Sequence, residues 1–187
     1  MALINIPDSG IWSSIASALN SMFTDIYNNS DGWGYYQDTQ YTTGNRFSVT
    51  GNVDTDLPNN KLSVIESQKP DDVATFYDGL TIPGRNGDDI IISIDFTVVP
   101  TSASTSLIEV WLDITGGTGT PTGLANLYRR IFTFPKGTGV ERKISLSHSG
   151  YTLNTWEANG AAVKIRTDNS ADIFDINYII KRTHKAR

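Results

Sequence analysis

Residues 88–99 read DDIIISIDFTVV, and this stretch carries the clearest structural signal in the chain. Its apolar side chains fall on every second position: Ile90, Ile92, Ile94, Phe96 and Val98. An alternation with a period of two is typical of a β-strand with one buried face. A proline and a loop of serine and threonine close the stretch, as is common at the end of a strand. We therefore predict a long strand with one face in a hydrophobic core.

Shorter patterns of the same kind recur along the chain after residue 46. The predicted strands are 47–53, 62–66, 75–77, 107–114, 127–134, 140–147, 151–156 (the weakest pattern), 162–167 and 173–181. In the last, we expect Phe174, Ile176, Tyr178 and Ile180 to share one face. Glycine- and proline-rich turns such as PGRNG at 83–87 separate nearly all of the strands. Roughly eight to ten short strands with a turn about every ten residues predict an all-β, antiparallel fold, which could be a β-sandwich, a jelly roll or a barrel.

The first 31 residues have a different period, which predicts a short amphipathic helix. Pro7, Asp8 and Ser9 can start it. Apolar side chains then follow at steps of three and four, which is the seam of a heptad repeat. The stripe consists of Trp12, Ile15, Leu19, Met22 and Ile26, widened by Phe23. The opposite face is polar and almost uncharged.

This helix could pack its stripe onto its own domain, or lie outside the β domain and bury the stripe against copies of itself or another protein. A helix of this length is marginal alone in water, so it needs a partner surface. Because everything after residue 33 reads as β, we expect an attachment or oligomerisation element. The expected organisation is a helix over 1–31 and a sandwich over 32–187, in which 32–46 form an extended arm or edge strand.

Composition excludes many classes of function. The 187 residues contain no cysteine and two histidines, which excludes disulfides, thiolate metal sites and centres with several histidines. No apolar run is long enough to span a membrane. Residues 1–128 carry 15 acidic and 4 basic side chains, whereas 129–187 carry 5 and 11. Part of that basic excess is the end of the chain, Lys181 to Arg187, which we expect to be a solvated tail. An acidic chain without a basic stripe among aromatics is not expected to bind nucleic acid.

No motif for catalysis stands out, and we predict no enzyme activity, no cofactor and no metal. Residues 116–123 read GGTGTPTG, which lacks the lysine of a phosphate-binding loop and is better explained as a turn. His148 continues the face of Ile144 and Leu146, so we expect it to be packed in the core or an interface. Pairs of loop aspartates such as Asp54 and Asp56 are common turn residues and do not by themselves indicate calcium.

The segment WGYYQDTQY at 33–41 concentrates aromatic side chains. Exposed aromatics can lie in protein interfaces or stack on sugar rings. We expect interface or ligand contacts from Trp33, Tyr35, Tyr36 and Tyr41, with a structural role favoured over a ligand platform.

The chain after residue 32 resembles a group of virion structural proteins of marine tailed phages. The stretches that carry the resemblance are GWGYYQDTQYTTGNRFSV at 32–49, IDFTVVP at 94–100, RIFTFPKGTG at 130–139, YTLNTWEANGAAVKI at 151–165 and DIFDINYIIKRTH at 172–184. The resemblance implies jelly-roll-like β-sandwich subunits that form trimers on the virion, as head decoration, head fibre or tail-associated proteins. It also implies that the N-terminus is the attachment part.

Two functions follow as hypotheses. In the first, the chain is a non-enzymatic virion structural protein of the decoration or fibre type, a homotrimer held to other virion proteins by its N-terminus. Such a protein would be located in the virion, after assembly in the host cytoplasm. In the second, it is a receptor-binding module of a tail fibre or tail tip that recognises host-surface glycans.

Overall fold

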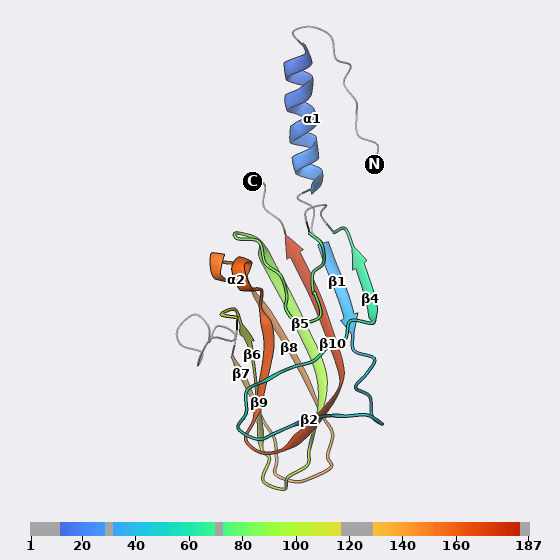
Figure 1. The fold of residues 1–187 in the computed structure, drawn as a ribbon, viewed down its shortest axis with the longest axis vertical. Helices are drawn as coiled ribbons and strands as arrows, with labels where there is room; N and C mark the ends of the chain where they lie inside the picture. Colours follow the sequence, from blue (N-terminus) through green and yellow to red (C-terminus); the bar gives the residue numbers. More distant parts are fainter. Residues whose placement is uncertain (1–11, 29–31, 70–72, 117–128, 184–187) are drawn as a thin grey trace.

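The computed structural model describes residues 12–28, 32–69, 73–116 and 129–183, which form two helices and ten strands (Figure 1). In chain order these are α1 (Trp12–Asn28), β1 (Gly32–Gln37), β2 (Phe47–Val49), β3 (Thr55–Asp56), β4 (Ser63–Ser67), β5 (Asp89–Pro100), β6 (Leu107–Asp113), β7 (Arg130–Thr133), β8 (Arg142–Tyr151), α2 (Asn154–Asn159), β9 (Ala162–Thr167) and β10 (Ala171–Thr183). The strands form two antiparallel sheets. The prediction of an all-β sandwich after an N-terminal helix is therefore confirmed.

The larger sheet has the order β4-β1-β10-β5-β8, and β2 pairs with the first residues of β10. Its two longest strands, β5 and β10, lie side by side in the middle (Figure 1). The five predicted core residues of β5 are all buried, because alternate side chains of a strand point to the same face. The smaller sheet has the order β3-β9-β6-β7. The hydrophobic core draws on both sheets, as expected for a sandwich.

A β-bulge in β10 changes which side chains reach the core. The register with β5 shifts between Phe174 and Asn177, and Asp175 lies there with a positive φ of 54°. The extra residue moves the inward positions from 171 and 173 to 176, 178 and 180. We had predicted that Phe174 shares the face of Ile176, and this prediction is wrong. Phe174 packs instead beneath the guanidinium of Arg46, which lies 5.0 Å from its ring centroid.

Two other predicted strands are wrong. Residues 151–156 contain the end of β8 and the start of α2, whose Trp156 is buried and donates its indole N–H to the carbonyl of Ile82 at 2.8 Å. Residues 75–77 form no strand, although Phe76 and Tyr77 are both buried in the core. In 75–77 two buried aromatic side chains produced the apolar pattern without a strand, whereas in 151–156 only Trp156 is buried, and Tyr151 and Leu153 are exposed.

The C-terminal basic residues are not all in a solvated tail. Strand β10 runs to Thr183, and Arg182 is buried with its guanidinium 5.8 Å from the ring centroid of Phe76. Lys181, its neighbour, is exposed on the opposite face of the strand. The remaining basic residues at 185–187 lie outside the described part of the chain, as does His184.

Residues 32–37 are not the arm or edge strand that we expected. They form β1, which pairs with β10 on one side and β4 on the other, and so lies inside the sheet. The loop that follows is held by Asp38, whose carboxylate accepts hydrogen bonds from the backbone N–H groups of Gln40 and Tyr41. This folds 38–46 against the sandwich.

Helix α1 lies beyond the end of the sandwich where β1 begins and β10 ends (Figure 1). No residue of α1 belongs to the core cluster. The predicted helix start at Pro7 to Ser9 and its predicted end after residue 28 lie outside the described residues. Neither described helix is long and apolar enough to cross a membrane.

Candidate functional site

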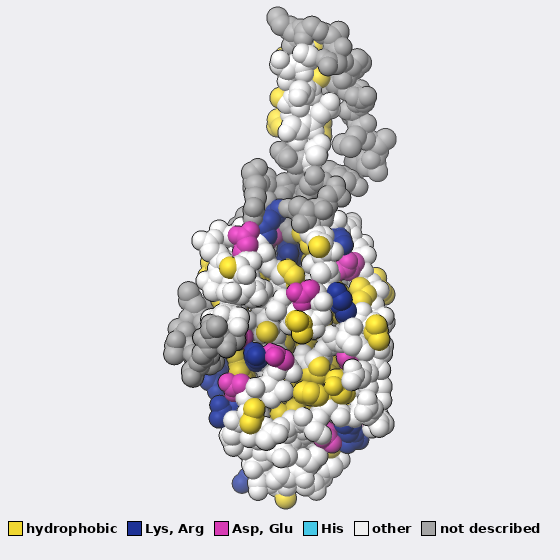
Figure 2. All heavy atoms as spheres, in the orientation of Figure 1, with side chains coloured by type: hydrophobic (Ala, Val, Ile, Leu, Met, Phe, Trp, Pro, Cys, Tyr) yellow, Lys and Arg dark blue, Asp and Glu magenta, His cyan; other side chains and the backbone are white. Residues whose placement is uncertain are grey.

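The apolar stripe of α1 is the first candidate site. Trp12 is 62% exposed and Met22 is 58% exposed, and Ile15 and Phe23 are exposed as well. Leu19 is half-buried, and the side chain of Ile26 is not among those described. The helix thus stands outside the sandwich and presents large apolar groups on its surface (Figure 2). Contiguous apolar surface of this kind typically marks an interaction site.

A second apolar surface lies on the outer face of the larger sheet. Trp33 and Tyr35 point outward from β1, because they occupy alternate positions of the strand. Tyr35 pairs with Ile65 of β4 and with Ile179 of β10. In the next row, Trp33 pairs with Lys181, which in turn pairs with Ile91 of β5. The outer-face patch therefore consists of Trp33, Tyr35, Ile65, Ile91 and Ile179, and all but the half-buried Tyr35 are exposed.

Tyr36 does not belong to either surface, so its prediction as an interface or ligand aromatic is wrong. It points inward and is fully buried. Its hydroxyl donates to Glu66 at 2.5 Å and accepts from the N–H of Phe76 at 3.1 Å. Burial opposes ionisation of Glu66, but hydrogen bonds from Tyr36 and Thr75 outweigh it and lower the pKa of that carboxyl. Burial and the same carboxylate raise the pKa of Tyr36. This cluster joins β1 to β4 and to the segment after it.

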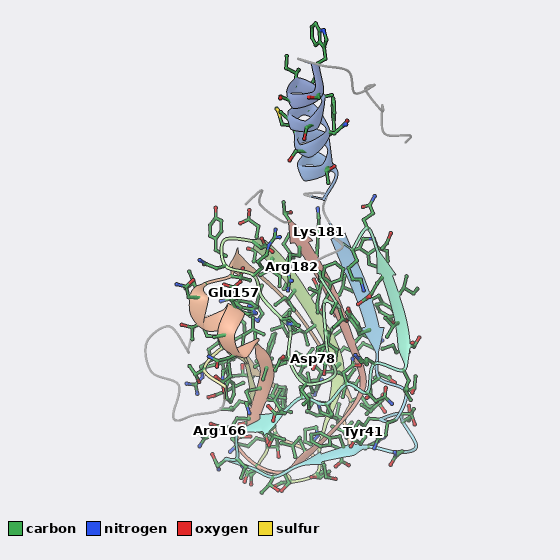
Figure 3. All side chains as sticks on the ribbon, turned by 45° about the horizontal axis from the view of Figure 1, so that its top comes forward. Tyr41, Asp78, Glu157, Arg166, Lys181 and Arg182 are labelled. Carbon is green, nitrogen blue, oxygen red and sulfur yellow. The ribbon has the colours of Figure 1, made fainter. Side chains whose placement is uncertain are left out.

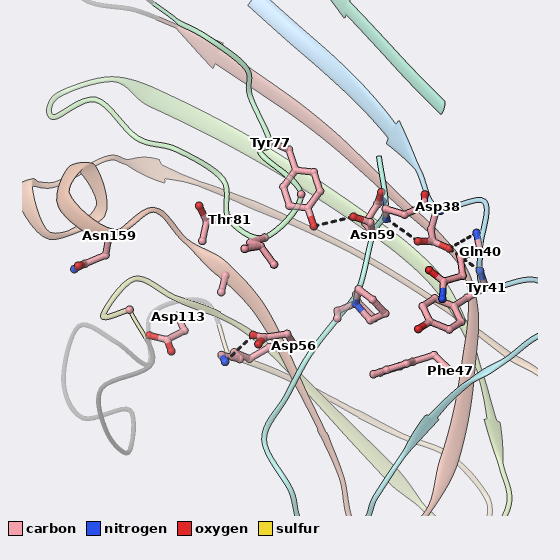
Figure 4. Close-up of a pocket in the computed structure, with 18 residues that line it drawn as sticks. Asp38, Gln40, Tyr41, Phe47, Asp56, Asn59, Tyr77, Thr81, Asp113 and Asn159 are labelled. Carbon is pink, nitrogen blue, oxygen red and sulfur yellow. Dashed lines mark hydrogen bonds and ion pairs between the residues drawn. The ribbon is translucent and has the colours of Figure 1, made fainter. Parts of the chain in front are cut away.

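Tyr41 lies in a cleft of about 630 Å³ at the side of the sandwich (Figure 4). The cleft forms where β9 changes neighbours. Its residue Val163 accepts a hydrogen bond from Leu57, beyond β3, whereas Ala161 forms a bridge with Ile82. Ala162 lies between these two contacts. It pairs with β6 on one side, but no described strand pairs with it on the β3 side, which leaves a gap at the edge of the smaller sheet. The volume falls within the ~300–1,000 Å³ range of small-molecule sites.

The three carboxylates that line the cleft differ in how many hydrogen bonds or ion pairs they already form within the protein. The carboxylate of Asp38 accepts three backbone N–H groups, including that of Asn60 at 2.7 Å. Asp56 forms an ion pair with Lys164 across the β3–β9 ladder, with an N···O distance of 2.6 Å. Asp113 is only 7% exposed and uses one carboxylate oxygen, Oδ1, to hold the turn at Thr115. The carboxylates of Asp38 and Asp56 therefore have a structural role, whereas the second oxygen of Asp113, Oδ2, is not used in holding the turn.

Acidic and histidine side chains do not gather into a metal site in the described ranges. No three residues among their histidines, aspartates and glutamates lie close enough together to hold a metal ion. His148 is buried in the sandwich, as predicted, and faces Arg130 of the other sheet. Burial, with a smaller contribution from Arg130, lowers the pKa of His148 to about 4. The predicted turn over 116–123 falls largely outside the described residues.

Sequence reasoning missed the cleft and its carboxylate. Asp113 reads as an ordinary outward position at the end of the strand predicted over 107–114. The residues that surround it come from 38–47, 56–60, 77–81 and 159–164, which only the topology brings together. A polar residue that ends an apolar strand was the one local signal available.

Comparison with known proteins gives a distant structural likeness. No protein-family model matches the chain, and no curated protein sequence matches it. Among solved structures, the chain is similar to PRD1 vertex protein P5, with 16% sequence identity and a TM-score of 0.42. The match covers 83% of this chain and 74% of that one. A likeness at this level does not establish a function for this chain.

Proposed function

We propose that the protein is a non-enzymatic structural subunit of a phage virion, of the decoration or fibre type, held to the particle through its N-terminal helix. The observation that carries the proposal is the position of α1, which lies outside the sandwich with the apolar side chains of its heptad stripe exposed. The resemblance of five stretches of the sandwich to phage virion proteins supports the same role. The sandwich itself would act by shape and contact.

The proposed assembly is a homotrimer, in which copies of α1 pack along their stripes. Steps of three and four between apolar residues are the spacing that lets like helices pack side by side. The outer-face patch lies near the end of the sandwich at which α1 stands (Figure 3, where Lys181 marks that end). The number three comes from the resemblance, since the residues of the stripe do not select three strands over two.

The test compares two double variants of the phage gene. Leu19→Asp with Met22→Asp places charge in the stripe, whereas Ser17→Asp with Ser21→Asp places the same charge on exposed positions of the opposite face. Purified particles are then assayed for the subunit by quantitative mass spectrometry. We expect the first variant to be absent from particles and the second to be present at the wild-type level. Incorporation of the first variant at the wild-type level would refute attachment through α1.

A second candidate function is recognition of host-surface glycans, and the cleft at Tyr41 is the observation that favours it. Recognition would come from the cleft and not from the aromatic segment as a whole, because Tyr36 is buried and Trp33 lies on another face. Adsorption of phage to host cells treated with glycosidases would test this function separately from assembly.

A further inference from the structure

We propose that the cleft beside Asp113 binds a neutral saccharide, with Asp113 Oδ2 as the acceptor for its hydroxyl groups. This inference rests on the second candidate function and supplies its site and ligand class. It does not depend on α1, because none of the residues that line the cleft belongs to the helix.

Asp113 has one carboxylate oxygen that can accept a hydrogen bond from a ligand hydroxyl. Its Oδ1 accepts the backbone N–H of Thr115 at 2.9 Å and the Thr115 hydroxyl at 2.6 Å. No donor in the described part of the chain reaches Oδ2, although the residue is nine-tenths buried. Asp113 lines the cleft, so a ligand hydroxyl can donate a charge-assisted hydrogen bond to this oxygen. Its neighbour in the ladder is Ala162, whose small side chain leaves the carboxylate open to the cleft.

The end of the cleft around Asp113 is richer in acceptors than in donors. Asn159 lies at this end in Figure 4, and its amide nitrogen already donates to the carbonyls of Ile114 and Thr155. Its Oδ1 is left to accept, since the other described residues donate nothing to it. The hydroxyl of Thr81 is already used as a donor to Asp78. A ligand that bonds here must therefore bring several hydroxyl donors of its own, which a sugar does.

The opposite end of the cleft has an aromatic face, beside the polar side chains of Asp38 and Gln40 (Figure 4). The rings of Tyr41 and Phe47 lie 5.2 Å apart between centroids and are tilted by 59°, and both are half-buried. Figure 4 places them across the cleft from Asp113. Leu57 and Pro58 also line the cleft. Aromatic and aliphatic groups can cover the C–H face of a pyranose while the polar end holds its hydroxyls.

The charges of the residues that line the cleft favour a neutral sugar over an anionic or a polybasic ligand. The one lysine of the lining, Lys164, is neutralised by Asp56, so the cleft offers no strong attraction for an anion. The carboxylate of Asp38 accepts hydrogen bonds from three backbone N–H groups, and that of Asp56 is paired with a lysine. Asp113 is the one carboxylate of the lining that has neither a cation nor three donors around it. A single carboxylate is weak attraction for a polybasic peptide.

The experiment is saturation-transfer NMR on the full chain with a panel of neutral sugars: glucose, galactose, mannose, N-acetylglucosamine and N-acetylgalactosamine. Titration then gives Kd for each sugar that responds. Two variants probe the site in different ways. Asp113→Asn keeps Oδ1 for the turn but replaces the acceptor, and Ala162→Phe fills the cleft without removing a polar group. Asp175→Asn, an exposed aspartate outside the cleft, is the matched control.

We expect at least one sugar of the panel to bind, and both cleft variants to weaken its binding by about tenfold or more. Asp113→Asn would do so by loss of a charge-assisted hydrogen bond, and Ala162→Phe by occupying the space of the ligand. Asp175→Asn should bind as the wild type does. Circular dichroism establishes that each variant is folded, and the two variants act through different chemistry, so misfolding of one leaves the other decisive. Silence of the whole panel would overturn the proposal, as would wild-type affinity in both variants. Binding of oligo-lysine that is lost in Asp113→Asn, with no sugar response, would overturn it in favour of a basic peptide. Virion incorporation of Asp113→Asn at the wild-type level would leave the structural role intact in every case.

Discussion

Acidification should weaken the sandwich through His148, in a pH range above that of the carboxylates. The imidazole is 4% exposed between the two sheets, and burial lowers its pKa to about 4 from 6.5. The unfolded chain takes up this proton near pH 6.5 and the folded chain only near pH 4. Between these values the unfolded state binds more protons, so the free energy of unfolding falls as the pH falls. A difference of 2.5 between the two pKa values corresponds to about 3 kcal/mol in total, of which about 2 kcal/mol is lost by pH 5.

Equilibrium unfolding in urea, followed by tryptophan fluorescence from pH 7.5 to pH 4.5 at one protein concentration, measures this loss. His148→Gln removes the titrating group, so its free energy of unfolding should be nearly constant over the range. His184→Gln is the control, since it removes the other histidine and should keep the wild-type slope. The carboxyls of Glu66, Asp78 and Asp168 have lowered pKa values, so their contribution is lost only below this range. A wild-type curve that is flat between pH 7.5 and pH 5 would refute the buried neutral histidine.

Three further perturbations test other parts of the structure. Tyr36→Phe removes the donor to Glu66 and should cost about 2 kcal/mol in urea unfolding, with the pKa of Glu66 rising toward its usual value; an unchanged midpoint would show that this hydrogen bond adds nothing. Gly160→Ala should cost at least about 2 kcal/mol, because φ is 71° and a Cβ would lie 2.5 Å from Thr81 Oγ1; a thermal midpoint equal to that of the wild type would contradict the geometry at the end of α2. Ile92→Ala, in the fully buried face of β5, should cost about 2–5 kcal/mol, whereas Ile91→Ala on the outer face should cost much less; equal losses would contradict the assignment of the two faces.

The strands with clean alternation were predictable from the sequence. Residues 162–167 form β9 with the predicted bounds, and 88–99 match β5 within one residue at each end. These stretches bury one face against a core, so apolar and polar residues alternate along them with a period of two. The helix was predictable for the same reason, because its steps of three and four extend over four turns.

What could not be predicted depends on contacts between distant segments. The bulge at Asp175 reverses the face of Phe174, and nothing in the local pattern marks it. The aromatic segment at 33–41 looked like one cluster, but strand alternation sends Trp33 outward and Tyr36 into the core, while the loop after β1 carries Tyr41 to the cleft. The cleft beside Asp113 lies at the gap in the β9 ladder, beyond the end of β3 at Asp56. Topology, and not residue type, creates that site.

The most direct test of the central claim is the mass of the purified full chain by sedimentation equilibrium at micromolar concentration. If α1 lies outside the sandwich as an association element, the wild type should have three times the 20.5 kDa of one chain, about 62 kDa. Leu19→Asp with Met22→Asp should then have the mass of a monomer and keep the β-sheet circular dichroism spectrum. A wild-type chain that sediments as a 20.5 kDa monomer, or a charged variant that keeps the wild-type mass, would contradict the account.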